Sequence, residues 1–268
     1  MPQPLISLHD VTMQFGTQTV LQNVTLDVFP RQTVAMIGES GCGKSVMLKL
    51  IVGLLRPTCG TVLFAGRDLR SMTESELSAL RLRMGFLFQG AALFDSLTVF
   101  DNVAFGLRAK GGVRESAVRD LVLKQLQEVG LAANVMNKRP VELSGGMRKR
   151  VGLARAMALE PEVMLYDEPT TGLDPIMTDV INQLIVRTKT LYPVTSLVVT
   201  HEMRTVKHVA DRVVMFYPRA RLRPGEGQIL YDGPPDGLEH AGDPRVPQFV
   251  LGEARDRIDE LRAEMSHV

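Results

Sequence analysis

A glycine-rich stretch near the N-terminus constrains this chain more than any other part of it. Residues 38–45 read Gly-Glu-Ser-Gly-Cys-Gly-Lys-Ser and match G-x-x-x-x-G-K-[ST], the spacing of loops that hold the phosphates of a nucleoside triphosphate. The apolar run 32–37 before them is typical of a buried strand, and residues 46–52 after them are typical of a helix. Strand, loop and helix therefore follow one another in the order that such a loop needs.

The residue types in this stretch suit a bound phosphate. Its glycines let the backbone turn tightly enough for several N–H groups to face one anion, and the following helix start adds partial positive charge. Lys44 is expected to meet the β- and γ-phosphates, and Ser45 a magnesium ion. A glycine-rich turn that matches by chance is the alternative. The predicted nucleotide contacts here are Gly38, Glu39, Ser40, Gly41, Cys42, Gly43, Lys44, Ser45 and Val46.

Composition excludes several classes of protein. The chain has 268 residues, of which 45% are hydrophobic, as is typical of a globular protein with a sizeable core. Its net charge of +1, with acids and bases interspersed, argues against a nucleic-acid partner. The sequence has neither an apolar run long enough to cross a membrane nor the pattern of a signal peptide. We therefore expect a cytoplasmic protein that reaches any membrane through a partner.

Polar residues stand where two apolar runs end. Gln89 follows the run 85–88, and Asp167 and Glu168 close the run 163–166. In an open α/β sheet the carboxyl ends of the strands face the ligand, so Gln89 is placed to meet the ligand or its metal. Because side chains alternate along a strand, Asp167 is expected to hold the magnesium shell and Glu168 to orient or deprotonate the attacking water.

Two further residues each allow two interpretations from their position. His201 follows the strand-like run 196–200, and Thr205 excludes the zinc motif H-E-x-x-H. His201 is therefore either a packed or hydrogen-bonded histidine or a γ-phosphate contact. Phe15 stands before Gly16 at a strand end, where it either stacks on an adenine ring or packs at the sheet edge.

The pattern changes to helices without intervening strands between about residues 98 and 158. Helices are predicted over 99–110 and 115–129, and a third helix opens at Ser144, which indicates a helical insertion in an α/β chain. Ser144, Gly145 and Gly146 either cap that helix or bind a second anion. The basic run 148–150 behind them is interpreted as a solvated helix face.

The remaining segments complete a predicted organisation. Residues 5–37 suggest an antiparallel strand group, and runs near 213–216 and 227–231 suggest a hairpin. We expect one domain over 1–241, with its helical part at about 98–158, followed by a C-terminal loop and helix over 242–268. Ile258, Leu261 and Met265 would form one apolar stripe on that helix, which we expect to pack on a neighbouring subunit.

Taken in order over residues 5–250, these motifs resemble the nucleotide-binding subunit of an ATP-binding-cassette (ABC) transporter. The resemblance implies an α/β fold with a P-loop NTPase (RecA-like) core, an antiparallel β subdomain and a helical insertion. The motifs that carry it are Phe15, residues 38–45, Gln89, Leu143-Ser144-Gly145-Gly146, Met164–Glu168, Gly172-Leu173-Asp174 and His201.

The resemblance also implies roles for these residues. Phe15 would stack on adenine, residues 144–146 would be the signature loop, and Asp174 would lie at the nucleotide. The implied catalytic set is Glu168, His201, Lys44 and Gln89, and the implied Mg²⁺ ligands are Ser45, Gln89 and Asp167.

The resemblance further implies a homodimer. The signature loop of one copy would contact ATP held by the other, so that two copies sandwich two nucleotides. ATP would close the dimer and hydrolysis would open it. The helical insertion and Gln89 would pass this motion to a membrane permease, with the subunit peripheral on the cytoplasmic face of the inner membrane.

Within the family, details resemble the ATPase of Mla/Mce-type phospholipid transport systems, which implies a lipid-binding Mce-type partner. They are the wording of residues 38–45, Gln89-Gly90-Ala91-Ala92-Leu93-Phe94, Val99-Phe100-Asp101-Asn102-Val103, Met147 with the bases after it, and Asp243-Pro244-Arg245-Val246. Amino-acid and other solute importers have similar cassettes and stay the alternative. Tyr166 and Phe15 depart conservatively from the commoner family residues.

Two other function classes compete with a transport ATPase. ABC proteins of translation usually carry two cassettes, and those of DNA repair carry a long coiled coil, whereas this chain has one phosphate loop and no heptad run. A nucleotide-dependent scaffold without turnover would be expected to lack the base, but Glu168 and His201 are both present. The sequence therefore favours a transport ATPase.

Overall fold

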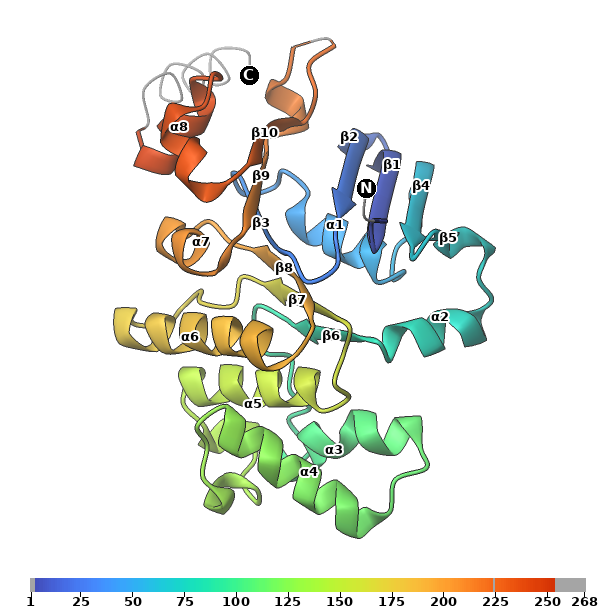
Figure 1. Cartoon of the computed structure of the whole chain (residues 1–268), viewed down its shortest axis with the longest axis vertical. Helices are drawn as coiled ribbons and strands as arrows, with labels where there is room; N and C mark the ends of the chain where they lie inside the picture. The colour runs from blue at the N-terminus through green and yellow to red at the C-terminus, as the bar shows by residue number, and fades with distance from the viewer. Residues whose placement is uncertain (1–2, 224, 254–268) are drawn as a thin grey trace.

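Two β-sheets and the helices around them build the computed structural model, which describes residues 3–223 and 225–253 (Figure 1). The larger sheet has the spatial order β10 (Ile229–Gly233), β9 (Arg212–Phe216), β3 (Thr33–Ile37), β8 (Thr195–Val199), β7 (Val163–Asp167) and β6 (Met84–Leu87). The smaller sheet has the order β2 (Gln18–Val28), β1 (Ile6–Phe15), β4 (Cys59–Phe64) and β5 (Arg67–Asp68).

The larger sheet is parallel from β9 through β3, β8 and β7 to β6, and β10 joins β9 as an antiparallel edge. Every residue of β3 and β8 is buried, which explains their continuous apolar runs, since a parallel sheet is covered on both faces. The helices that follow its strands are α1 (Lys44–Ile51), α6 (Pro175–Leu191) and α7 (Met203–Val209). The predicted hairpin near 213–231 is confirmed as β9 and β10.

The smaller sheet is antiparallel and packs over α1. Strands β1 and β2 form a long hairpin, and β4 pairs with the other edge of β1. Buried side chains of both sheets and of α1 form one hydrophobic cluster. The antiparallel group predicted over residues 5–37 is therefore confirmed for β1 and β2, whereas β3 belongs to the parallel sheet.

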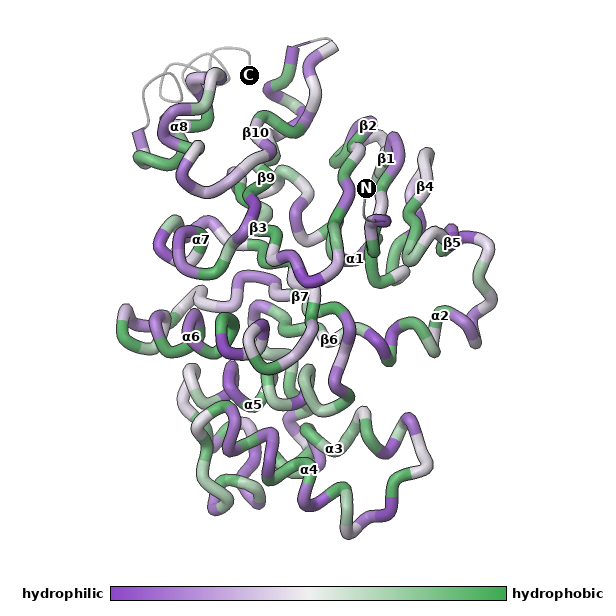
Figure 2. The backbone as a smooth tube through the Cα atoms, viewed as in Figure 1, coloured by the Kyte–Doolittle hydropathy of each residue, from purple (hydrophilic) through white to green (hydrophobic). Residues whose placement is uncertain are grey.

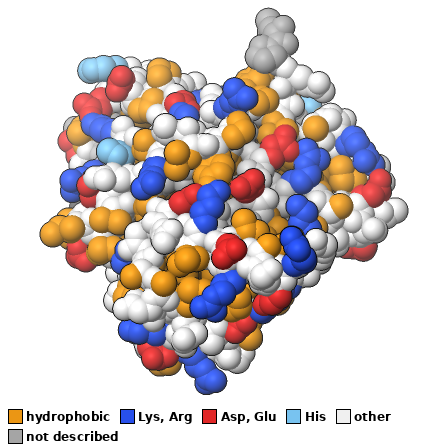
Figure 3. Space-filling view, turned by 60° about the horizontal axis from the view of Figure 1, so that its bottom comes forward, with side chains coloured by type: hydrophobic (Ala, Val, Ile, Leu, Met, Phe, Trp, Pro, Cys, Tyr) orange, Lys and Arg blue, Asp and Glu red, His pale blue; other side chains and the backbone are white. Residues whose placement is uncertain are grey.

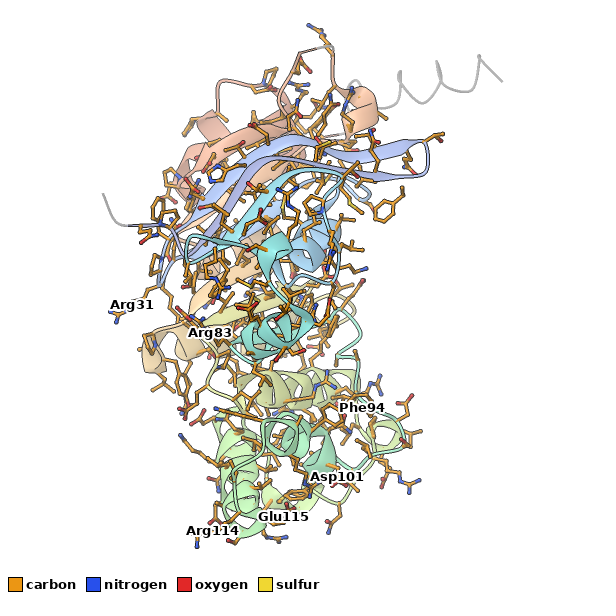
Figure 4. The ribbon with its side chains drawn as sticks, turned by 90° about the vertical axis from the view of Figure 1, so that its right-hand side faces the viewer. Arg31, Arg83, Phe94, Asp101, Arg114 and Glu115 are labelled. Carbon is orange, nitrogen blue, oxygen red and sulfur yellow. The ribbon has the colours of Figure 1, made fainter. Side chains whose placement is uncertain are left out.

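The helical part lies below the larger sheet in Figure 1. It consists of α3 (Val99–Lys110), α4 (Glu115–Glu128) and α5 (Gly145–Met157), close to the predicted bounds, while α2 (Glu74–Arg81) leads from the smaller sheet to β6. Arg108 ties α3 to α4 because its guanidinium pairs with Asp101 at 2.8 Å and with Glu115; the two carboxylates lie near each other in Figure 4.

Helix ends and faces follow from local sequence. Thr98 and Ser144 accept hydrogen bonds from the backbone N–H groups three residues later and so cap α3 and α5. Helix α6 buries residues 178, 181, 182, 185 and 188, which lie along one face. Both green and purple segments occur along it in Figure 2. Short 3₁₀ turns occur at Leu69–Ser71, Ala133–Val135, Pro140–Glu142, Arg219–Arg221 and Pro235–His240. Among the described residues, no helix is long and apolar enough to cross a membrane.

The C-terminal part differs from the expected loop. Helix α8 (Arg245–Leu251) lies in it, and its Val246 is buried in the cluster formed with β3, β9 and α7. Pro247 fits this helix because proline is tolerated in a first helical turn, and Gly252 ends α8 in the left-handed conformation, at φ 69°. The helix predicted over 253–265, with Ile258, Leu261 and Met265, lies outside the described residues, and the division at residue 241 stays a prediction.

Leu165 tests the placement of the core. It is fully buried in β7, so Leu165→Ala is expected to lower the free energy of unfolding by about 2–5 kcal/mol through the cavity it leaves. Urea unfolding followed by circular dichroism measures this loss. Val141 is 85% exposed, so the control Val141→Ala should change stability by less than about 0.5 kcal/mol. Equal losses in both variants would contradict the assignment.

Candidate nucleotide-binding and hydrolysis site

A cavity of about 830 Å³ opens at the carboxyl ends of β3, β7 and β8. It is lined by Gln18, Val20, Gly38, Glu39, Ser40, Gly41, Gly43, Lys44, Ser45, Val46, Gln89, Glu168, Val199, His201 and Phe249. The structure thus brings the phosphate loop together with three polar residues that the sequence placed at strand ends, namely Gln89, Glu168 and His201. Its size is within the range of small-molecule sites.

The phosphate loop can follow its path only with glycine at two positions. Gly38 has φ 139°, and a Cβ there would lie 2.1 Å from the carbonyl oxygen of Phe216 in β9. Gly43 has φ 97°, and its Cβ would lie 2.5 Å from Leu21 in β2. The buried ammonium of Lys44 lies inside the curve of this loop and donates to the carbonyl oxygens of Gly38 at 2.7 Å and Glu39 at 2.9 Å.

A buried glutamine that sequence reasoning missed supports the loop from beneath. The Gln228 amide donates to the carbonyl oxygens of Val20 at 2.9 Å and Cys42 at 3.1 Å, and it accepts from the N–H of Gln22. Cys42 and Cys59 are both free cysteines. Burial raises the pKa of the Cys42 thiol, which keeps it neutral beside Lys44.

Ser45 and Asp167 form the oxygen pair expected of a magnesium site. The Ser45 hydroxyl donates to Asp167 Oδ1 at 2.9 Å, because β7 ends beside the start of α1. Burial raises the pKa of Asp167, and the hydrogen bond from Ser45 opposes that shift. Mg²⁺ favours hard oxygen ligands and is usually bound through one or two carboxylates plus substrate phosphates, so this pair and the Gln89 side chain nearby suit it.

Glu168 follows the end of β7 with a left-handed backbone, at φ 49°, and its carboxylate has other partners than that of Asp167. Its Oε2 lies 2.9 Å from Nδ1 of His201 and accepts a hydrogen bond from the Thr171 hydroxyl at 3.0 Å. The Glu168 side chain is 14% exposed, whereas that of His201 is 63% exposed. The His201 ring is therefore not buried in the core. It stands at the cavity and contacts the carboxylate, which fits a hydrogen-bonded histidine, and its contact with a γ-phosphate stays a prediction.

Phe15 and residues 144–146 do not themselves line the cavity. Phe15 ends β1, is 45% exposed, and pairs across the hairpin with Gln18, which does line it. The Ser144 hydroxyl accepts from the N–H of Met147 at 3.3 Å, the capping contact that was one of its two interpretations. Asp174 caps α6 by accepting from two backbone N–H groups, each at 3.0 Å.

The basic run after the signature-like loop is a solvated face only in part, since Arg148 is exposed, Arg150 is half-buried and Lys149 is buried. Lys149 is buried, and its ammonium donates to the carbonyl oxygens of Gln89 and Glu168, while Arg148 and Arg150 also donate to backbone carbonyls. Burial lowers the pKa of Lys149, and the carboxylates of Glu168 and Asp167 oppose this shift. A helical pattern could have shown the burial of Lys149, because Gly152 and Ala156 follow on the same face.

Residues late in the sequence also lie at the phosphate loop, and no sequence motif indicated this. Arg221 pairs with Glu39 of the loop, and Phe249 of α8 lines the cavity. The guanidinium groups of Arg221 and Arg245 lie 4.7 Å and 4.8 Å from the ring centre of Tyr217, so this aromatic side chain helps to hold both arginines.

Known proteins are similar in sequence to this chain along most of its length. The sequence model of the family described as ABC transporter matches residues 21–171. The chain is 40% identical over 256 residues to the intermembrane phospholipid transport system ATP-binding protein MlaF of Haemophilus influenzae, covering 95% of this chain and 93% of that protein. It is 38% identical over 252 residues to MlaF of Escherichia coli K12, and 40% identical over 247 residues to a Mycobacterium leprae protein, mkl, named for ribonucleotide transport, of which it covers 69%.

Solved structures share the fold. The dimeric structure of MJ0796, described as a bacterial ABC transporter cassette, aligns with a TM-score of 0.77 and 30% identity over 85% of this chain and 98% of that one. A post-hydrolysis dimer of the same cassette bound to ADP and Pi has a TM-score of 0.76. CbiO1 from Clostridium perfringens, at 24% identity and a TM-score of 0.76, supports the fold alone.

Gly38 provides a test of the loop geometry. Gly38→Ala is expected to weaken ATP binding by about tenfold or more, because a side chain there must displace β9 or change the loop. Binding of a fluorescent ATP analogue measures the effect. A Cβ at Gly242 would meet open space, so Gly242→Ala is the matched control and should bind as the wild type does. Wild-type affinity in Gly38→Ala would refute the geometry.

Proposed function

We infer the task of this subunit from one premise: the chain belongs to the ABC transporter family of ATP-binding proteins. It is the ATP-hydrolysing subunit of a membrane transporter. What it moves, what it assembles with and which residue performs which step are our proposals. The observation that supports them most directly is the arrangement of the phosphate loop, Ser45 with Asp167, and Glu168 with His201 around one cavity.

The cavity supports an assignment of chemical roles. The loop N–H groups and Lys44 hold the phosphates of ATP, and Ser45 and Asp167, with Gln89, hold Mg²⁺. When bound, Mg²⁺ neutralises charge on the phosphate oxygens. Glu168 orients the attacking water or accepts its proton, and His201 holds Glu168 through their contact and faces the γ-phosphate. Positioning and charge stabilisation supply most of the catalysis in such a reaction.

The positions of residues 144–146, Asp174 and Phe15 support a homodimer. Residues 144–146 and Asp174 do not line the cavity of their own chain, although the starts of α5 and α6 lie together, since a Cβ at Gly146 would lie 2.7 Å from Met177. We propose that both loops face ATP bound by a second copy, as the dimeric state of the similar MJ0796 cassette suggests. Phe15, exposed at the end of β1, then stacks on the adenine ring.

Phospholipid is the cargo that the relatives favour. Each MlaF relative is covered over 90% or more of its length, and its name states intermembrane phospholipid transport. We propose that the subunit works at the cytoplasmic face of the inner membrane, bound to an integral-membrane permease that is served by an Mce-type lipid-binding protein. Basic and acidic side chains intermingle on the face in Figure 3, which suits a chain without a nucleic-acid partner. The mkl relative makes ribonucleotide the second candidate cargo.

Glu168→Gln tests the assignment of the general base. The amide keeps the size of the side chain but cannot accept a proton, so we expect a loss of turnover of about 100-fold or more with ATP binding retained. Steady-state phosphate release and equilibrium ATP binding measure the two effects. Gln183→Glu, at an exposed position of helix α6, is a control for the change of one charge. Normal hydrolysis by Glu168→Gln would remove Glu168 from the mechanism.

The cargo is tested on the intact complex. Affinity purification of the full chain from its native membrane is expected to recover a multi-spanning permease and a lipid-binding protein, with phospholipid detected by mass spectrometry. ATPase activity of this complex in phospholipid vesicles should depend on the lipid-binding protein. Recovery with only a solute permease, or stimulation by ribonucleotides in place of lipid, would overturn the phospholipid assignment.

A further inference from the structure

Helix α5 reaches the hydrolysis site through a buried lysine. The ammonium of Lys149 donates to the carbonyl oxygen of Glu168 at 3.1 Å and also to that of Gln89, and the residue is only 5% exposed. These two acceptors belong to different loops, one after β7 and the other after β6. A single side chain therefore joins the proposed base, the proposed metal contact and the helix that Ser144 caps.

The same face of α5 contacts the loop after Gln89 at two further positions. Gly152 leaves room for this loop, because a Cβ there would lie 3.2 Å from the side chain of Ala91. Arg155 donates to the carbonyl oxygens of Ala91 at 2.8 Å and Ala92 at 2.7 Å. Positions 149, 152 and 155 are spaced by three residues, which places them along one side of the helix.

The backbone is strained where α5 holds it. Ala91, Ala92 and Glu168 have φ values of 62°, 46° and 49°, in the left-handed region that residues other than glycine seldom adopt. Each of their carbonyl oxygens accepts a hydrogen bond from Lys149 or Arg155. Such conformations persist only where the surroundings hold them, and these two cations provide that restraint.

We propose that Lys149 is a positioning residue that couples the signature loop to the hydrolysis site of its own chain. Its two hydrogen bonds fix Glu168 and Gln89 relative to α5, whose first residues follow Ser144. When Ser144 engages the nucleotide of the other copy, Glu168 and Gln89 are therefore held in place by the same rigid helix. The inference rests on the proposed function, since it assigns Lys149 to the setting of Glu168.

The consequence of removing the ammonium follows from this geometry. Without it, the carbonyl oxygens of Glu168 and Gln89 lose their buried donor, and the backbone of Glu168 can relax toward a more favourable φ. The carboxylate then shifts relative to the attacking water. Because a displacement of about 1 Å can cost about 100-fold in rate, turnover is affected more than ATP binding.

The test compares variants of the full-length chain in steady-state ATPase assays. Lys149→Met keeps the length of the side chain and is expected to lower kcat by about 10- to 100-fold, while KM for ATP changes by less than about threefold. Lys149→Arg restores a donor and should recover part of kcat. Arg150→Met is the matched control, because Arg150 donates at 2.9 Å to the carbonyl oxygen of Gly130, outside the site. It should keep wild-type kcat.

Thermal unfolding of the same variants separates positioning from general destabilisation. Unchanged kcat in Lys149→Met would overturn the inference, as would equal losses of kcat in Lys149→Met and Arg150→Met that follow their losses of Tm. If the wild-type protein binds ATP but does not hydrolyse it, the proposed function is wrong. The role of Lys149 in positioning Glu168 is then wrong as well.

Mixed dimers show in which copy Lys149 acts. A dimer of one Lys149→Met copy and one Glu168→Gln copy should be nearly inactive, because one site has an unsupported Glu168 and the other has no base. With both substitutions in one copy and a wild-type partner, one site keeps an intact Glu168 and Lys149 and should turn over. The reverse result would mean that Lys149 acts on the site of the other copy, and it would overturn the proposal.

Discussion

The parallel pairing of β3, β8 and β7 is the constraint on which the rest of the structure depends. Its hydrogen bonds set Met36 beside Val199 and Asp167 beside the same residue, so the three strands end at one edge. The phosphate loop leaves β3 there, and the acidic pair leaves β7 there. The cavity therefore forms where the register of these strands brings their carboxyl ends together.

Two neighbouring carboxylates acquire different surroundings at this edge. Asp167 meets the Ser45 hydroxyl, and Glu168, one residue later, turns to His201. The left-handed backbone of Glu168 contributes to this separation, and a lysine from another part of the fold holds it. The two carboxylates are adjacent in the chain, but their surroundings differ because the backbone turns between them.

Sequence reasoning identified the motif residues because each motif depends on residues that are close together in the chain. Gln89 and Glu168 stand at strand ends, and the expectation that they share one cavity holds in the structure. The burial of Lys149 was not predicted, because the basic run was interpreted from its neighbours in the sequence. The hydrogen-bond partners of Lys149 lie in other loops. Helix α8 was missed because it is only seven residues long and its buried Val246 packs on β3, β9 and α7, which lie far from it in the sequence.

The contact of late residues with the phosphate loop has a consequence for how the chain matures. Gln228 hydrogen-bonds to Cys42 across 186 positions, and Arg221 pairs with Glu39 across 182. The phosphate loop therefore gains this support only after residues 221–228 have been synthesised. Contacts of such sequence separation slow folding, and a nucleotide that binds the folded loop stabilises the domain in which these contacts have formed.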